Sequence, residues 1–131
     1  MIRVSTTFDL GRDKQRMKNP ADAARQTKTA DEILRRLFHD NANERWEHQI
    51  LADEVGMGKT FVALAVAFSL LEQMLAGNEP ADLAGCYQKV VILTPGNSSL
   101  FAKWYREVSE FVKRCVDDSR RAEVEAWFKP I

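Results

Sequence analysis

Two short apolar runs and one long apolar segment between them dominate the hydrophobic pattern of this chain. The first run, Ile50-Leu51-Ala52, ends at Ala52, and the second covers residues 90–94 and is ended by Pro95. A short, continuous apolar run of this kind is typical of a strand that is buried on both faces. Residues 59–76 are apolar nearly all round, which indicates a covered helix, and Gly77 is a typical helix stop. This order predicts a right-handed unit of strand, helix and strand.

Helical patterns also flank this unit. Asn19 followed by Pro20 is typical of a helix N-cap and its first helical position, and the pattern continues toward Phe38 as one helix or two. A second amphipathic helix follows residues 98–99, where either serine would be the cap, and residues 118–131 indicate a third.

The residues before Asn19 are polar and partly basic. We interpret residues 1–18 as a solvated N-terminal extension, with a contact to nucleic acid as the alternative, and residues 19–131 as the folded part.

The segment between the first strand and the long helix has the chemistry of a phosphate-binding loop. Its residues are Asp53, Glu54, Val55, Gly56, Met57, Gly58, Lys59 and Thr60. Glycines at 56 and 58 allow successive N–H groups to face an anion, and the helix start adds further donors. Lys59 would contact the β- and γ-phosphates, and the Thr60 hydroxyl would bind Mg²⁺. The strict pattern has a glycine in place of Asp53, so a helix that merely begins with Gly-Lys-Thr is the alternative.

The run from Ala52 to Thr60 closely resembles motif I of superfamily 2 helicases, above all the Swi/Snf-like and related bacterial ATPases. A second segment resembles motif Ia of the same family: Leu93, Thr94, Pro95, Ser98, Ser99, Leu100, Lys103, Trp104 and Glu107. The resemblance covers roughly residues 25–111. It implies an α/β fold, namely a P-loop (RecA-like) three-layer parallel sheet that is incomplete at its C-terminal side.

The resemblance also implies roles for residues outside the loop. Gln26 would read the edge of adenine, and its alternative is a surface glutamine on a helix. Gln49 competes for this role, but it lies inside the strand that leads into the loop and is too close to the loop. Thr94, Pro95 and Ser98 would contact a sugar-phosphate backbone, and their alternative is an ordinary turn into a helix.

The catalytic residues of a motor are not recognisable in the sequence. Such a motor needs a hydrophobic strand that ends in Asp-Glu, to hold Mg²⁺ and activate water. The acidic pair Asp117-Asp118 follows a stretch that Lys113 and Arg114 interrupt. No arginine finger or second lobe is recognisable either. We therefore assign no catalytic residue, and the chain resembles the N-terminal part of a longer motor or a truncated relative.

Composition and charge limit the kinds of partner, metal site and location that we expect for this chain. The formal net charge is zero, so bulk charge does not indicate a nucleic-acid partner. Cys86 and Cys115 form no CxxC motif, which favours reduced thiols over a metal site. The N-terminus has no apolar block, and the longest apolar run, residues 61–68, is too short to span a bilayer. These features predict a cytoplasmic location.

Together, the motifs predict the ATP-binding segment of a nucleic-acid-dependent ATPase, a helicase or translocase, with ATP and Mg²⁺ as cofactors. DNA is favoured over RNA as its track, and a second polypeptide would supply the rest of the motor. The alternatives are a small P-loop kinase and a non-catalytic remnant that binds a nucleotide or a partner. Whether the chain is an enzyme stays open.

Overall fold

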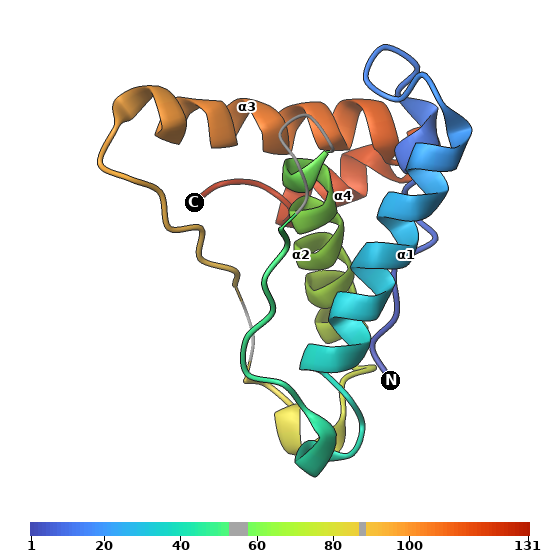
Figure 1. Ribbon diagram of the computed structural model, residues 1–131, viewed down its shortest axis with the longest axis vertical. Helices are drawn as coiled ribbons and strands as arrows, with labels where there is room; N and C mark the ends of the chain where they lie inside the picture. Colours follow the sequence, from blue (N-terminus) through green and yellow to red (C-terminus); the bar gives the residue numbers. More distant parts are fainter. Residues whose placement is uncertain (53–57, 87–88) are drawn as a thin grey trace. The chain divides into compact units, whose positions relative to one another are not determined.

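The computed structural model describes residues 1–52, 58–86 and 89–131, which belong to two compact units (Figure 1). Unit 1 contains Met1–Ser5 and Arg25–Val90, and unit 2 contains Thr6–Ala24 and Val91–Ile131. Each unit is therefore built from two segments that are distant in the sequence.

The predicted α/β fold with its RecA-like parallel sheet is wrong, because the described residues form helices and no β-strand. The α-helices are α1 (Pro20–Leu37), α2 (Lys59–Leu75), α3 (Ser98–Cys115) and α4 (Arg121–Trp127). Short 3-10 helices lie at Leu10–Arg12, Ala42–Glu44, Ala81–Leu83 and Asp118–Arg120.

The two runs predicted as strands are present as segments without regular structure. No described residue forms a backbone ladder with residues 50–52 or 90–94. A strand is stable only where a neighbouring strand pairs with its N–H and C=O groups. Apolarity shows that a segment favours burial, but it does not provide this neighbour. Of the predicted strand–helix–strand unit, only the helix is therefore present among the described residues.

The predicted helices are confirmed at most of their boundaries. Asn19 caps α1 by accepting a hydrogen bond from the N–H of Ala21 at 3.0 Å, and α1 is one continuous helix. Helix α2 ends at Leu75, and Gly77 has the positive φ of 73° that suits a helix stop. The predicted C-terminal helix is shorter than its pattern and covers only α4.

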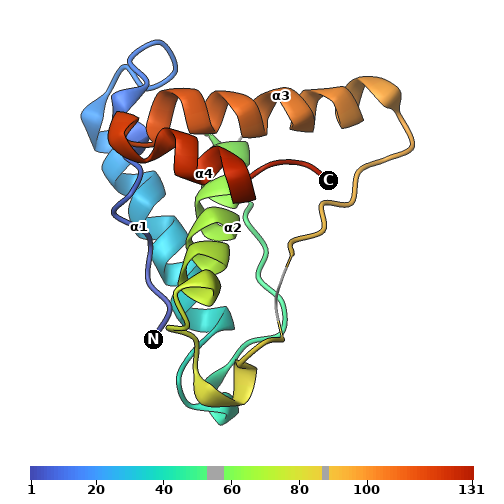
Figure 2. The same ribbon diagram turned by 180° about the vertical axis from the view of Figure 1, so that it is seen from behind.

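The core of unit 1 lies between α1 and α2, which run side by side in both views (Figures 1 and 2). Its central residues are buried: Ile2, Leu34, Phe38 and Leu70, with Val4, Leu37, Val66, Met74 and Leu83 packed around them. Helix α2 buries residues on several faces, as its all-round apolarity predicts. This packing fixes the position of the first turn of α2 relative to the part of α1 in this unit.

The N-terminal residues of unit 1 are held by specific hydrogen bonds. The Ser5 N–H donates to the Ser69 hydroxyl at 2.9 Å, and the Ser5 hydroxyl donates to Glu72 at 2.6 Å. Arg3 forms a bidentate pair with Asp31 on α1, at 2.9 and 2.7 Å. The hydroxyl of Ser69, fully buried inside an apolar helix, is thereby satisfied.

Unit 2 is built around the second half of α3, with α4 beside it in both views. The ring of Phe111 lies 5.2 Å from Phe8 and 5.8 Å from Phe128, centre to centre. Phe8 and Val116 form an isolated antiparallel bridge, which joins the N-terminal segment of this unit to the end of α3. In the part of the chain that the structure describes, no helix is both long and apolar enough to cross a membrane.

Candidate functional site

The start of α2 combines a left-handed glycine with a basic first residue. Gly58 is the N-cap, with φ of 82° and ψ of 28°, and it offers no side chain to cap the helix. Its carbonyl accepts the N–H of Val62 at 3.1 Å, so the helix is formed from its first turn. Lys59 and Thr60 follow directly and are half-buried. A helix start whose N-cap residue has no side chain, next to a lysine, has the positive character that attracts phosphate oxygens.

Gln26 of α1 lies directly against Gly58. A Cβ added to Gly58 would lie 2.1 Å from the Gln26 side-chain nitrogen and 2.8 Å from its amide carbon. Gln26 is only 4% exposed, so its amide cannot simply move into solvent. The structure thus brings together two residues that sequence analysis had assigned to one nucleotide site from separate parts of the chain. The surface-glutamine alternative for Gln26 does not hold, whereas its role in reading adenine stays a prediction.

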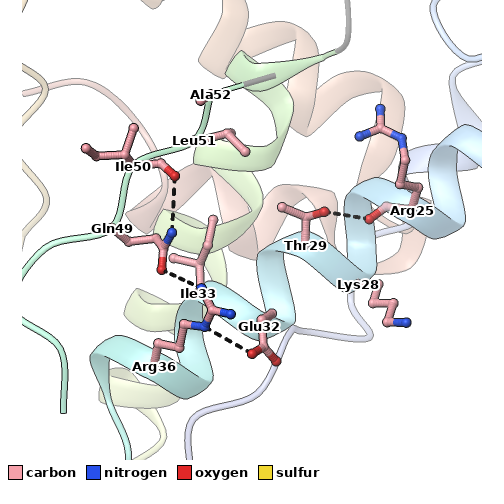
Figure 3. Close-up of a pocket in the computed structure, with 10 residues that line it drawn as sticks. All are labelled: Arg25, Lys28, Thr29, Glu32, Ile33, Arg36, Gln49, Ile50, Leu51 and Ala52. Carbon is pink, nitrogen blue, oxygen red and sulfur yellow. Dashed lines mark hydrogen bonds and ion pairs between the residues drawn. The ribbon is translucent and has the colours of Figure 1, made fainter. Parts of the chain in front are cut away.

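A pocket of about 490 Å³ lies between α1 and residues 49–52 (Figure 3). One wall comes from a single face of α1: Arg25, Lys28, Thr29, Glu32, Ile33 and Arg36. The other wall is Gln49, Ile50, Leu51 and Ala52, the segment that leads into the predicted loop. The pocket therefore joins a mostly polar wall to a mostly apolar one, and its α1 wall begins at the residue next to Gln26.

Hydrogen bonds join the two walls at one end of the pocket (Figure 3). Arg36 donates to Glu32 at 3.1 Å and to the Gln49 side chain at 3.2 Å, and Gln49 donates to the Ile50 carbonyl at 3.1 Å. The hydrogen bond from Arg35 is the main cause that lowers the pKa of Glu32 to about 2. Glu32 is thus ionised at neutral pH, and the charges of Arg35 and Arg36 balance it. Arg25 and Lys28 add positive charge nearer the N-terminus of α1.

This pocket was not predicted from the sequence, because Gln49 was expected inside a strand and the polar face of α1 had no expected role. The spacing of the six α1 residues was a usable signal, because steps of three and four place them on one helical face. The spacing could not indicate that residues 49–52 would lie against that face.

The remaining predicted site residues lie elsewhere. Asp53, Glu54, Val55, Gly56 and Met57 are outside the described residues, so the geometry of that part of the loop stays a prediction. In unit 2, Pro95 and Ser98 are exposed, and the half-buried Thr94 donates its hydroxyl hydrogen to the Pro95 carbonyl at 3.1 Å. Neither predicted serine caps α3; the cap is Asn97.

The acidic pair Asp117-Asp118 takes part in ion pairs within unit 2. Arg12 lies 3.3 Å from Asp117 and 3.2 Å from Asp118, and Arg121 lies 2.6 Å from Asp118. Among residues 1–52, 58–86 and 89–131, no group of three or more His, Cys, Asp or Glu side chains is placed to hold a metal. The Mg²⁺ role of Thr60 stays a prediction, since it would be completed by phosphate oxygens and water.

No known protein family, curated protein or solved structure matches this chain. The predicted membership of the superfamily 2 helicases is therefore wrong, because that family is defined by a RecA-like sheet and the described residues contain no strand. Gly58, Lys59 and Thr60 at a helix start do not depend on that family for their chemistry.

Proposed function

We propose that this chain binds a nucleoside triphosphate, ATP together with Mg²⁺, at the start of α2. The observation that carries the proposal is the contact of Gln26 with Gly58. Because of this contact, a buried amide lies beside the first residues of α2, Lys59 and Thr60. Lys59 and the first-turn N–H groups would bind the phosphates, and Thr60 would join the Mg²⁺ shell.

The neighbouring pocket supports the same ligand class. Its apolar wall of Ile50, Leu51 and Ala52 suits a base or ribose, and Arg25 and Lys28 suit phosphate. Its volume of about 490 Å³ lies in the range of small-molecule sites. The proposal is limited to binding, because ground-state contacts to phosphates do not by themselves accelerate hydrolysis.

The test is calorimetric titration of Mg-ATP into the full chain. Lys59→Ala removes a charge-assisted hydrogen bond worth about 1.5–3 kcal/mol and should weaken binding roughly ten- to a hundred-fold. Lys103→Ala, which removes an exposed lysine of α3 in unit 2, is the matched control and should leave the affinity unchanged. Equal affinity of Lys59→Ala and the parent chain would remove the assignment.

Nucleotide selectivity tests the role of Gln26. Gln26→Ala should reduce the preference for ATP over GTP, because the amide can pair with the adenine edge through one donor and one acceptor. Competition between the two nucleotides on the same preparations measures this. An unchanged ratio would leave Gln26 as a residue that only positions Gly58.

Two further expectations accompany the proposal. A contact of nucleic acid with Thr94, Pro95 and Ser98 is testable by fluorescence anisotropy of labelled single-stranded DNA and RNA, with Ser98→Glu expected to weaken it through charge repulsion. We also propose a cytoplasmic location, because ATP is found there and Cys86 and Cys115 are both free thiols.

A further inference from the structure

The middle of the α1 wall presents two hydrogen-bond acceptors to the pocket (Figure 3). Thr29 donates its hydroxyl hydrogen to the Arg25 carbonyl at 2.9 Å, so its oxygen is left as an acceptor for a ligand. Glu32 lies one turn farther along the same face, and its ionised carboxylate can only accept. Two acceptors are thus neighbours in a wall whose other polar residues on α1 are cationic.

Glu32 can accept a further hydrogen bond although two arginines bind it. Among the described residues, its Oε1 accepts from both Arg35 and Arg36, whereas its Oε2 accepts only from Arg35, at 3.0 Å. An ionised carboxylate has about four lone-pair sites, so one site on Oε2 remains. The Glu32 side chain is 42% exposed in the pocket wall, which allows a ligand to reach this site.

The charges of the pocket are ordered along α1. Arg25 and Lys28 lie at the end next to Gln26, which contacts Gly58 at the start of α2. Lys28 forms no ion pair with any described residue, so its charge is available to a phosphate. At a rise of about 1.5 Å per residue, Glu32 lies about 6 Å farther along the helix axis than Lys28. Phosphates would therefore be attracted to the first end of the pocket and repelled at Glu32.

We propose that this pocket selects ribonucleotides, with Thr29 and Glu32 accepting hydrogen bonds from the 2′- and 3′-hydroxyls of the ribose. The ribose is the uncharged part of a nucleotide that directly follows the phosphates, and its adjacent hydroxyls bring two donors to the two acceptors. A carboxylate binds a ribose hydroxyl in the same way in dinucleotide sites. This selectivity rests on the proposed nucleotide binding and adds its substrate class, the ribonucleoside triphosphates.

The test is competition of Mg-ATP with 2′-deoxy-ATP and with 3′-deoxy-ATP for the full chain, because each analogue lacks one hydroxyl. The parent chain should prefer ATP over both, and by at least about tenfold over the analogue that lacks the donor to the charged acceptor. Glu32→Ala should lower that ratio by about tenfold. Thr29→Val keeps the shape of the side chain, and it should lower the other ratio by about two- to tenfold. General damage to the pocket would weaken all three nucleotides and leave both ratios unchanged.

Arg35→Gln is the matched control. It removes the main partner of Glu32 and lies outside the pocket lining, and Glu32 stays ionised at neutral pH without it, so both ratios should be unchanged. Equal affinity of the parent chain for ATP and both analogues would overturn the ribose contact and leave the proposed ATP binding intact. Ratios that do not change in Glu32→Ala and Thr29→Val, or that fall equally in Arg35→Gln, would overturn it as well. A parent chain that binds none of the three nucleotides would overturn both proposals.

Discussion

Helices α2 and α3 begin in opposite ways. At the start of α3, Asn97 has an extended backbone and its side chain accepts the N–H of Ser99 at 2.8 Å. At the start of α2, the same position is Gly58, which has a left-handed backbone and no side chain. The start of α3 is thus capped by its own chain, whereas the start of α2 has no such cap.

This difference separates a structural helix start from one suited to a ligand. A side-chain cap occupies the place that an anion would otherwise take at the N–H groups. Gly58 has no side chain to take that place, and it lies against Gln26, next to Lys59. The proposed phosphate binding would therefore depend on the missing side chain at position 58 as much as on Lys59.

The largest expected effect comes from Gly58→Ala. A left-handed backbone costs an L-residue about 1–2 kcal/mol, and the added Cβ would collide with Gln26 at a further cost of about 1–3 kcal/mol. We expect the free energy of unfolding, measured by urea denaturation, to fall by about 2–5 kcal/mol.

Two other glycines separate these contributions. Gly77 has a similar φ of 73°, but a Cβ there would meet open space. Gly77→Ala should therefore lower the free energy of unfolding by only about 1–2 kcal/mol. Gly96→Ala has neither problem and should stay within about 0.5 kcal/mol of the parent. In a Gln26→Ala background, the cost of Gly58→Ala should approach that of Gly77→Ala. Equal costs at Gly58 and Gly77 in the parent chain would contradict the contact with Gln26.

Asn97→Ala should have a smaller effect, since it removes one capping hydrogen bond from α3. We expect a loss of about 1 kcal/mol in the free energy of unfolding, and no change in Mg-ATP affinity. Asn97→Ser keeps a capping oxygen and should recover most of the loss. A change in nucleotide affinity in Asn97→Ala would show that the two helix starts are not independent.

The ion pair of Arg3 with Asp31 predicts a pH dependence of unit 1. The hydrogen bond from Arg3, with a weaker one from the Val4 N–H, lowers the pKa of Asp31 below its usual value. A lowered carboxyl pKa stabilises the folded state above the unfolded pKa, and this contribution is lost as the pH falls through the folded pKa. Asp31→Asn should therefore cost up to about 1 kcal/mol near neutral pH and less as the solution is acidified below about pH 4.

Urea denaturation at several pH values measures this effect. Glu123→Gln removes an exposed pair with Arg120 between neighbouring turns of unit 2, and serves as the control with little expected change at neutral pH. A cost of Asp31→Asn that does not depend on pH would contradict the charge-based explanation.

The smallest expected effect is a difference in reactivity between the two thiols, which involves no change in the stability of the protein. Burial, together with the nearby charge of Asp13, raises the pKa of Cys115 to about 12, whereas Cys86 is exposed. Because the thiolate is the reactive form, a thiol reagent at neutral pH should modify Cys86 promptly and Cys115 only after denaturant is added. Cys86→Ser should abolish the fast reaction. A fast reaction that persists in Cys86→Ser would show that the end of α3 opens readily.

The pocket along α1 shows where sequence-based prediction ended. The spacing of Arg25, Lys28 and Arg36 indicates only that these residues share one face of a helix. That residues 49–52 cover this face depends on contacts between segments that have no regular pattern in common. The burial of Ile2 and Phe8 also depends on such contacts, because their neighbours in the sequence are mostly polar.

By itself, the sequence determined the helices, because their hydrogen bonds join residues only four positions apart and their caps lie next to them. Asn19 with Pro20, the apolar segment from Lys59 to Leu75, and Gly77 are confirmed on that basis. Only the tertiary structure decided that no described residue pairs with the runs at 50–52 and 90–94 as a strand, since a strand needs a partner from a distant part of a chain. It also decided that Gln26 lies against Gly58, a contact that depends on how α1 and α2 pack within unit 1.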